Sequence, residues 1–219
     1  MDPANSLIKG PYAIVDNTYC PQTDHVALAH LFLKGGARLL QLRMKGERDL
    51  KKITRTVSAI MEFKKAYDFT FIVNDHAAVA REIGADGEHG GADDLPIQEA
   101  RVLLGKGFLI GYSAHSIEEA LEAERRGADY VAFGAIFPTR TKPVGHPVQG
   151  LEKLRELVKK TAIPVVAIGG IHRKNLHQVL ETGVASVAMI GALTQAQDVT
   201  EEVKWYCQAI KSFSLPRGT

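Results

Sequence analysis

Eight mostly apolar segments of strand length alternate with helix-period segments along the whole chain. They are residues 12–16, 37–43, 70–75, 86–89, 108–112, 129–135, 164–169 and 185–190. Most of these segments are apolar on both faces, which is typical of parallel strands covered by helices. Eight such units in 219 residues predict an α/β fold, a single-domain (β/α)8 TIM barrel. Periodicity alone leaves an open doubly wound sheet as the competing fold.

A repeated glycine favours closure of the sheet. The stretches GGAR (35–38), GADG (84–87), GADY (127–130) and GVAS (183–186) each place a glycine after a predicted helix and before a predicted strand. A glycine there can end the helix in the left-handed conformation. The stretches return on every second strand, as expected for an eight-stranded barrel built from four βαβα units. We expect an N-terminal extension (1–11), a barrel domain (12–213) and a C-terminal tail (214–219).

Charge and cysteine content argue against several classes of protein. The 27 basic and 25 acidic residues give a net charge of +2, and aromatic residues make up 7% of the chain, so neither nucleic acid nor a membrane is an expected partner. No apolar run approaches the length of a membrane span, and the first ten residues do not read as a signal peptide. Cys20 and Cys207 show no metal-ligand spacing. We expect a cytoplasmic protein with small-molecule partners, and a homo-oligomer stays open.

Polar residues recur where the predicted strands end. They are Gln41, Arg43, Lys45, Asn74, Asp75, His89, Asp93, Asp94, Ser113, His115, Thr139, Thr141 and Lys142. In a parallel barrel these ends meet at one mouth, where the active site lies. Gln41, Arg43 and Lys45 alternate, so we expect them to share one face of a strand. As alternatives, Asn74–Asp75 and Asp93–Asp94 could cap the following helices, and His89 could be a core histidine.

These residue types suit a diphosphate and a metal ion. Arg43, Lys45 and Lys142 supply three cations, whereas Asp75 and Asp94 would repel an anion unless a cation lay between. Mg²⁺ takes carboxylate and phosphate oxygens as ligands, so the sequence predicts a Mg²⁺ site. No activated nucleophile stands out, and a departing diphosphate needs charge stabilisation rather than a protein nucleophile.

A second anion site is expected after strands 7 and 8. Gly169–Gly170 and Gly191 let backbone N–H groups approach a phosphate, and barrels often bind phosphate there. The loop 136–149 is long for its place and contains three prolines, which is typical of a functional loop. Its Thr139, Thr141 and Lys142 form a phosphate-binding set.

The chain resembles the thiamine-phosphate synthases, also called thiamine-phosphate pyrophosphorylases, from about Tyr12 to about residue 210. The stretches that carry the resemblance are QLRMK, FIVND, GEHGGADDLP, GYSAHSIEEALEAERRGADYVAFGAIFPTRTKP, PVVAIGGI and VAMIGAL. The resemblance implies a transferase of thiamine biosynthesis. It would join 4-amino-5-hydroxymethyl-2-methylpyrimidine diphosphate to 4-methyl-5-(2-phosphoethyl)thiazole, with diphosphate leaving first in a dissociative, Mg²⁺-assisted substitution.

The resemblance also implies roles for individual residues. Gln41, Arg43, Lys45, Asn74, Ser113 and Lys142 would hold the pyrimidine diphosphate, with Lys142, Ser113 and Arg43 as catalytic residues. Asp75 and Asp94 would bind Mg²⁺. Thr139, Thr141, Gly170, Ile190 and Gly191 would receive the thiazole phosphate.

The chain departs from the family pattern in two places. Around residues 87–94 the family has G-[VI]-H-[LIV]-G-Q-x-D, and here Glu88, Gly90 and Ala92 replace two apolar residues and a glutamine. A carboxylate in a core strand is costly, so we expect this strand to be frayed or shifted. Gly191 replaces a serine, which predicts weaker thiazole-phosphate binding.

Three other functions stay open at this point. A thiazole tautomerase on the same barrel would transfer protons, with His115 as a candidate. A non-catalytic barrel that binds thiamine precursors would need no turnover. A phosphate-binding isomerase barrel would need an acid–base pair that the sequence does not offer.

Overall fold

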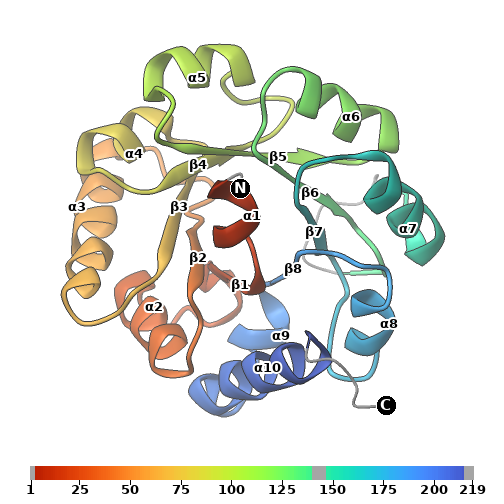
Figure 1. Ribbon diagram of the computed structural model, residues 1–219. Helices are drawn as coiled ribbons and strands as arrows, with labels where there is room; N and C mark the ends of the chain where they lie inside the picture. The colour runs from red at the N-terminus through yellow and green to blue at the C-terminus, as the bar shows by residue number, and fades with distance from the viewer. Residues whose placement is uncertain (1–2, 140–146, 215–219) are drawn as a thin grey trace.

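Eight parallel strands close into a barrel in sequence order (Figure 1). The computed structural model describes residues 3–139 and 147–214. The strands are β1 (Gly10–Val15), β2 (Leu39–Leu42), β3 (Thr70–Asn74), β4 (Gly87–Gly90), β5 (Leu109–Ala114), β6 (Tyr130–Gly134), β7 (Val165–Ile168) and β8 (Ser186–Met189). β1 pairs with both β2 and β8, so the sheet has no edge. The predicted TIM barrel is confirmed, and the open doubly wound sheet is excluded.

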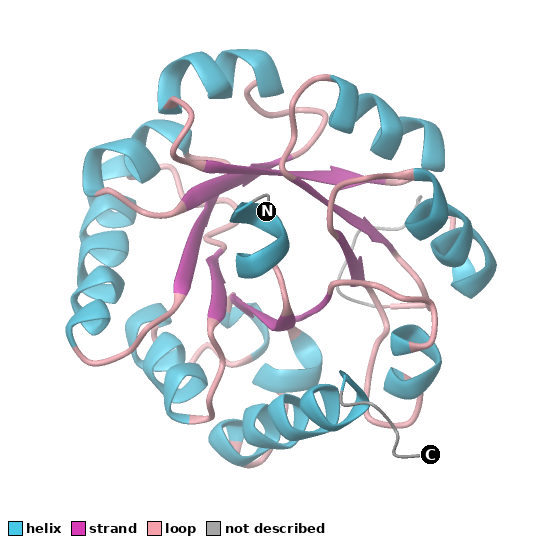
Figure 2. Cartoon of the chain, in the orientation of Figure 1, coloured by secondary structure: helices cyan, strands magenta, loops and turns pink. Residues whose placement is uncertain are grey.

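Helices surround the barrel on its outside (Figure 2). They are α2 (His25–Lys34), α3 (Leu50–Met61), α4 (Ala77–Ile83), α5 (Ile97–Leu104), α6 (Ile117–Arg125), α7 (Gly150–Lys160), α8 (Leu176–Leu180), α9 (Gly191–Thr194) and α10 (Val199–Ser214), with two short 3-10 helices, η1 (Asn17–Tyr19) and η2 (Glu62–Lys65). Within the described residues, no helix combines the length and apolarity that crossing a membrane would need.

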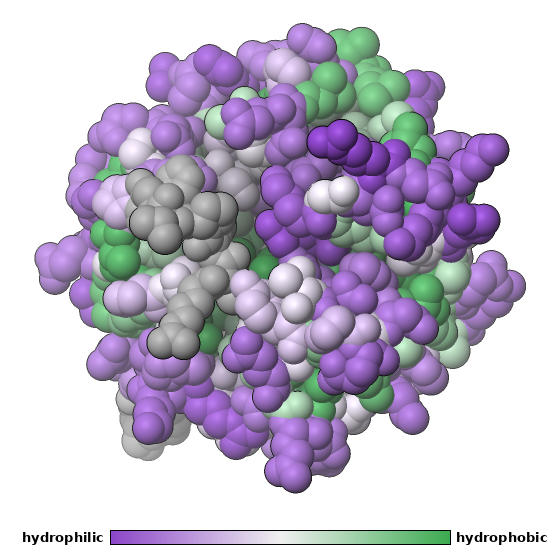
Figure 3. Space-filling model, turned by 180° about the vertical axis from the view of Figure 1, so that it is seen from behind, coloured by the Kyte–Doolittle hydropathy of each residue, from purple (hydrophilic) through white to green (hydrophobic). Residues whose placement is uncertain are grey.

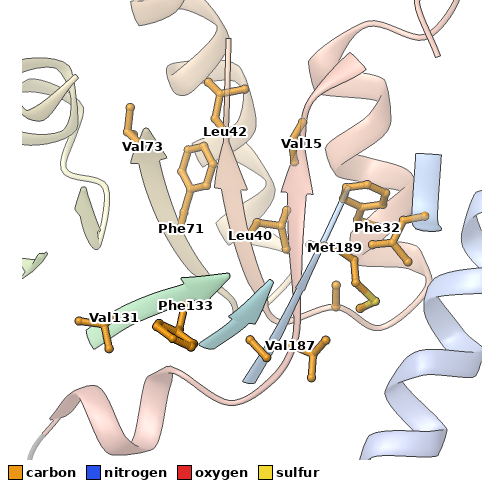
Figure 4. Close-up of a cluster of buried hydrophobic side chains, with 14 of the residues drawn as sticks. Val15, Phe32, Leu40, Leu42, Phe71, Val73, Val131, Phe133, Val187 and Met189 are labelled. Atoms are coloured by element: carbon orange, nitrogen blue, oxygen red, sulfur yellow. The ribbon is translucent and has the colours of Figure 1, made fainter. Parts of the chain in front are cut away.

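Two apolar layers hold the barrel together. The outward side chains of the strands pack against the helices, as Leu40, Leu42 and Phe71 do in Figure 4. The inward side chains form a separate cluster inside the barrel. The short helix α1 (Pro3–Leu7) lies over the barrel centre in Figure 1, and buried Ala4 and Ile8 join the interior cluster. The end of the barrel that faces α1 is therefore packed, which leaves the opposite end for a site.

The repeated glycines end helices as predicted. Gly36, Gly84, Gly127 and Gly183 have φ values of 98°, 75°, 97° and 85°, in the left-handed region that glycine enters without strain. Each one reverses the chain between a helix and the following strand. The repeat therefore encodes four equivalent turns at the closed end of the barrel.

Two of these repeats also carry an aspartate that binds the neighbouring strand. Asp86 Oδ2 accepts a hydrogen bond from the Phe71 backbone N–H at 2.7 Å, and Lys64 pairs with the same oxygen. Asp129 Oδ2 accepts from the Ile110 N–H at 2.6 Å and pairs with Arg101. Each carboxylate therefore accepts a hydrogen bond from a backbone N–H of the adjacent strand. This contact fixes the register of the two strands at their amino ends.

The strand that contains Glu88 is neither frayed nor shifted, so our expectation for it was wrong. β4 pairs with β3 from Gly87 to His89 and with β5 from Gly87 to Gly90, and all four of its residues are buried. The backbone hydrogen bonds on both sides are intact. Burial of Glu88 therefore raises the pKa of its carboxyl group and does not disrupt the strand.

We predict that Asp129→Ala destabilises the barrel. The substitution leaves the Ile110 N–H and Arg101 without their shared acceptor, and the loss of charge-assisted hydrogen bonds of this kind costs about 2 kcal/mol. Urea unfolding followed by far-UV circular dichroism measures the change. Asp68→Ala is the control, because Asp68 is exposed. Equal stability of the two variants would contradict the role assigned to Asp129.

Candidate active site

A cavity of about 660 Å³ opens at the carboxyl ends of the strands. Its walls include eight residues that we predicted as substrate-binding: Gln41, Arg43, Asn74, Ser113, Thr139, Gly170, Ile190 and Gly191. Apolar side chains, among them Ile14 and Ile168, form other parts of the wall. The face opposite to that seen in Figure 1, where the strands end, is mainly hydrophilic (Figure 3). The cavity thus combines an apolar floor with polar groups from several strands, as ligand sites do.

Arg43 is fixed in the cavity wall by Asp16, the residue that follows β1. The Arg43 guanidinium pairs with Asp16 Oδ2, and Asp16 is 2% exposed. Asp16 Oδ1 also accepts from the Thr18 N–H at 2.9 Å and from the Thr18 hydroxyl at 2.5 Å. Burial acts to raise the pKa of Asp16, but the hydrogen bonds from Thr18 and Arg43 outweigh burial and hold that pKa below its ordinary value. Asp16 therefore stays ionised and orients the guanidinium.

Gln41, Arg43 and Lys45 do not share one strand face, which corrects our expectation. β2 ends at Leu42, so Gln41 alone of the three lies within the strand. The Arg43 N–H still bonds to the Val15 carbonyl at 3.0 Å, whereas Lys45 lies in the loop beyond. Gln41 and Arg43 line the cavity, and Lys45 Nζ lies 3.9 Å from Asp75 Oδ2. The strand ends at Leu42, so the side chains of the residues that follow no longer alternate between two faces.

Asp75 and Asp94 lie close together beside Lys45. Asp75 follows β3 with φ 64° and donates its N–H to the His89 carbonyl at 3.0 Å. Burial, followed by the negative charge of Asp94, raises the pKa of Asp75, while Lys45 lowers it. Two carboxylates that share a site repel each other, and a cation between them would relieve this repulsion. The structure therefore brings the two predicted metal ligands together.

Neither acid caps the following helix, so the alternative of a purely capping role is excluded. The N-cap of α4 is His76 and that of α5 is Pro96, and neither cap involves a side-chain hydrogen bond. Asp94 Oδ2 instead accepts from the Gly91 N–H at 2.8 Å, which fixes the turn after β4.

Glu88 is a third acid near this pair. Its side chain lies on β4, is 4% exposed, and accepts no hydrogen bond within the described part of the chain. A Cβ built on Gly90 would lie 3.6 Å from Glu88 Oε2 and 3.4 Å from Asp94 Cβ, so the Glu88 carboxyl group packs beside Gly90 and near Asp94. Burial, and then the charges of Asp94 and Asp75, raise the pKa of Glu88 to about 8. The buried group therefore carries a proton at neutral pH.

The loops after β7 and β8 form the other side of the cavity. Gly169 and Gly170 have φ values of 100° and 67°. A Cβ on Gly170 would lie 2.6 Å from the Pro138 carbonyl oxygen, so no other residue fits there without a shift of the chain. Asn175 Nδ2 donates to the Gly170 carbonyl at 3.0 Å and holds this turn. The close packing places backbone groups of Gly170 and Gly191 at the cavity wall.

Two predicted residues, Thr141 and Lys142, lie outside the described residues. Three further residues of the site were not singled out from the sequence or were judged structural. Asp16 is a polar residue at the end of the first apolar strand, as Asn74 is at the end of the third. The same rule could have identified Asp16, but we did not predict it. His89 was noted at a strand end with a core histidine as the alternative, and it lines the cavity; Tyr12 lines it from inside β1, where nothing in the sequence separates it from a core residue.

The chain is similar to known proteins along almost its whole length. A family model described as thiamine monophosphate synthase matches residues 11–193. The thiamine-phosphate synthase of Nitrosococcus oceani is 40% identical over 215 residues, 97% of this chain and 98% of its own length. That of Pyrococcus furiosus is 41% identical over 198 residues, 88% of this chain and 92% of its own. A solved structure of thiamine phosphate pyrophosphorylase from Pyrococcus furiosus superimposes with a TM-score of 0.87 at 35% identity, covering 95% of this chain and 98% of that one.

We predict that Glu88 makes the unfolding free energy fall as pH rises. Its folded-state pKa of about 8 exceeds the ordinary value of 4.5, so the folded protein binds more protons between these values. The resulting stabilisation is complete below pH 4.5 and is lost as pH rises through 8. Each pKa unit corresponds to about 1.4 kcal/mol, so the loss should exceed about 2 kcal/mol.

Urea unfolding of wild type and Glu88→Gln at pH 5.5 and 8.5, in EDTA, measures this effect. The variant keeps the shape of the side chain without a titrating proton, so its stability should fall less between the two pH values. An identical pH dependence in both proteins would show that Glu88 ionises normally.

Proposed function

The chain belongs to the thiamine monophosphate synthase family, and we propose that it acts as a transferase that makes thiamine phosphate. Its substrates are 4-amino-5-hydroxymethyl-2-methylpyrimidine diphosphate and 4-methyl-5-(2-phosphoethyl)thiazole, and diphosphate is released. One observation on this chain's own residues supports the proposal. Gln41 and Arg43 from β2 and its end, Asn74 from β3 and Ser113 from β5 line one cavity, with Gly170 on its other side.

The residues at the rim fit a Mg²⁺ ion. Asp75 and Asp94 offer oxygen ligands, and Mg²⁺ is commonly held by one or two carboxylates together with substrate phosphates. No cluster of three or more metal-ligating side chains occurs in the described residues, which suits an ion whose other ligands are water and substrate. When bound, Mg²⁺ would neutralise charge on the leaving diphosphate. We propose Asp75 and Asp94 as its ligands.

In the reaction, the bond between the pyrimidine methylene carbon and the diphosphate oxygen breaks, and the electron pair leaves with the diphosphate. The thiazole nitrogen then forms the new C–N bond to that carbon. Arg43, held by Asp16, points a fixed positive charge into the cavity, and Ser113 supplies a hydroxyl. Both are proposed to stabilise the departing charge, which is the principal demand of such a step. Lys142 is proposed as a third group of this kind, and Lys45, Gln41 and Asn74 as pyrimidine-diphosphate ligands.

The thiazole phosphate is proposed to bind against the loops after β7 and β8. Gly170, Ile190, Gly191 and Thr139 line this part of the cavity, and Thr141 is proposed to join them. Backbone N–H groups at glycine turns can approach phosphate oxygens closely.

The structure offers less support for a thiazole tautomerase. His115, the candidate proton carrier, does not line the cavity in the described chain, and its Nδ1 lies 3.0 Å from the Gly134 carbonyl oxygen. A tautomerase also has no use for the acid pair at the rim.

We predict that product forms from the two phosphorylated substrates only when Mg²⁺ is present. Asp75→Asn removes a proposed ligand and should reduce turnover by about 10- to 100-fold or more, with a parallel loss of Mn²⁺ binding followed by electron paramagnetic resonance. The control is Asp93→Asn, which changes an exposed acid next to Asp94. Conversion of a thiazole tautomer without the pyrimidine substrate would overturn the synthase assignment.

We predict that Gly191→Ser strengthens thiazole-phosphate binding. The added hydroxyl supplies one more donor at the cavity wall, and one hydrogen bond to a charged group corresponds to about a tenfold lower KM for the thiazole phosphate. The KM for the pyrimidine diphosphate should not change. Gly191→Ala is the matched control, because it adds the Cβ without the hydroxyl. A serine variant that behaves as the alanine variant would place the phosphate elsewhere.

A further inference from the structure

A continuous line of hydrogen bonds crosses the interior of the barrel and joins two of the proposed pyrimidine-diphosphate ligands. Gln41 Nε2 donates to the Tyr12 hydroxyl at 2.8 Å, and the Tyr12 hydroxyl lies 2.8 Å from that of Tyr130. The Tyr130 hydroxyl lies 3.0 Å from His89 Nδ1, and His89 Nε2 lies 2.9 Å from Ser113 Oγ. Five side chains on five strands, β2, β1, β6, β4 and β5, are thus connected end to end.

The number of protons in this line fixes its direction. Tyr12 accepts from Gln41, so its one hydroxyl proton goes to Tyr130. Tyr130 then gives its own proton to His89 Nδ1. Reversing either link would leave a tyrosine proton without an acceptor, although Tyr12 and Tyr130 are 1% and 0% exposed. Unpaired buried donors cost free energy, so the line runs one way.

The direction determines which hydrogen-bonding groups reach the cavity. Because His89 Nδ1 accepts, its proton lies on Nε2, which donates to Ser113 Oγ. The Ser113 O–H proton then has no acceptor among the described residues and is free for a ligand in the cavity that Ser113 lines. At the other end Gln41 Oε1 likewise has no partner in the described chain.

We propose that Tyr12, Tyr130 and His89 form a positioning relay that sets Ser113 as a hydrogen-bond donor and Gln41 Oε1 as an acceptor toward the substrate. This inference rests on the proposed function, because a donor at Ser113 suits an anionic diphosphate oxygen and an acceptor at Gln41 suits an amino group of the pyrimidine. Tyr130 is not part of the cavity wall, so it acts on substrate only through its neighbours.

The fold is built around the middle of this relay. Gly111 on β5 lies where a Cβ would come 2.1 Å from Tyr130 Cζ and 2.4 Å from His89 Nδ1. A side chain at this position would drive the two rings apart. Burial raises the pKa of both tyrosines, so their hydroxyls keep their protons across the physiological range.

The test combines histidine ¹⁵N NMR on the ligand-free protein with kinetics on the Mg²⁺-loaded protein. Wild type should show His89 as the Nε2–H tautomer. Tyr130→Phe removes one hydroxyl from the centre of the relay, so His89 should shift toward a mixture of tautomers. kcat/KM for the pyrimidine diphosphate should fall about tenfold, with the KM for thiazole phosphate unchanged.

Tyr206→Phe is the matched control, because Tyr206 is an equally buried tyrosine in the outer layer on α10. It should change neither the His89 spectrum nor the kinetics. Tyr12→Phe, which breaks the relay at another link, should reproduce the kinetic loss of Tyr130→Phe.

Two results would overturn the relay: an Nδ1–H tautomer in wild type, which reverses its direction, or a Tyr130→Phe variant with unchanged tautomer and kinetics. Failure of the proposed function is separate from both. Wild type without synthase turnover would remove the proposed function, while the His89 tautomer would still report on the relay.

Discussion

Closure of the parallel barrel is the constraint on which the rest of the structure depends. β1 pairs with β8 in register from Gly10 opposite Ser186, and the Ser186 hydroxyl donates to the Gly10 carbonyl at 2.7 Å. Because all eight strands run the same way, all their carboxyl ends meet at one mouth. α1 covers the other end, where Ala4 and Ile8 enter the interior cluster. Side chains that are far apart in the sequence therefore come together at the open mouth and inside the barrel, and the active site uses both places.

The sequence was a good guide to features that are local and repeated. The alternation of apolar segments predicted every strand of the barrel, and the repeated glycines predicted its closure. The rule that polar residues gather where parallel strands end found Asn74 and Ser113 without any structure. The expected alternation of Gln41, Arg43 and Lys45 failed because the strand ends at Leu42. Side chains alternate between two faces only while the strand continues.

Contacts inside the barrel were not accessible to sequence reasoning. Tyr12 and Tyr130 are 118 residues apart, and their hydroxyls meet only because their strands cross the same interior layer. Each looks like an ordinary core aromatic in its own segment. Glu88 shows the opposite error. We expected its charge to disrupt the strand, but a carboxyl group with a raised pKa can stay neutral.

The balance of charge in the site bears on how an anion can bind there. Arg43 is already paired with Asp16, and Lys45 lies beside Asp75 and Asp94. These two cations face three carboxylates, so this part of the site carries no excess of positive charge for a diphosphate. A diphosphate that enters must bring or find further cations, which agrees with the proposed Mg²⁺ site. In such a nearly neutral cavity, uncharged hydrogen-bond donors contribute a larger share of the stabilisation of a bound anion. A serine hydroxyl that accepts from a buried line of hydrogen bonds keeps its own proton for the ligand, so it can stabilise a departing anion without repelling the metal ion beside it.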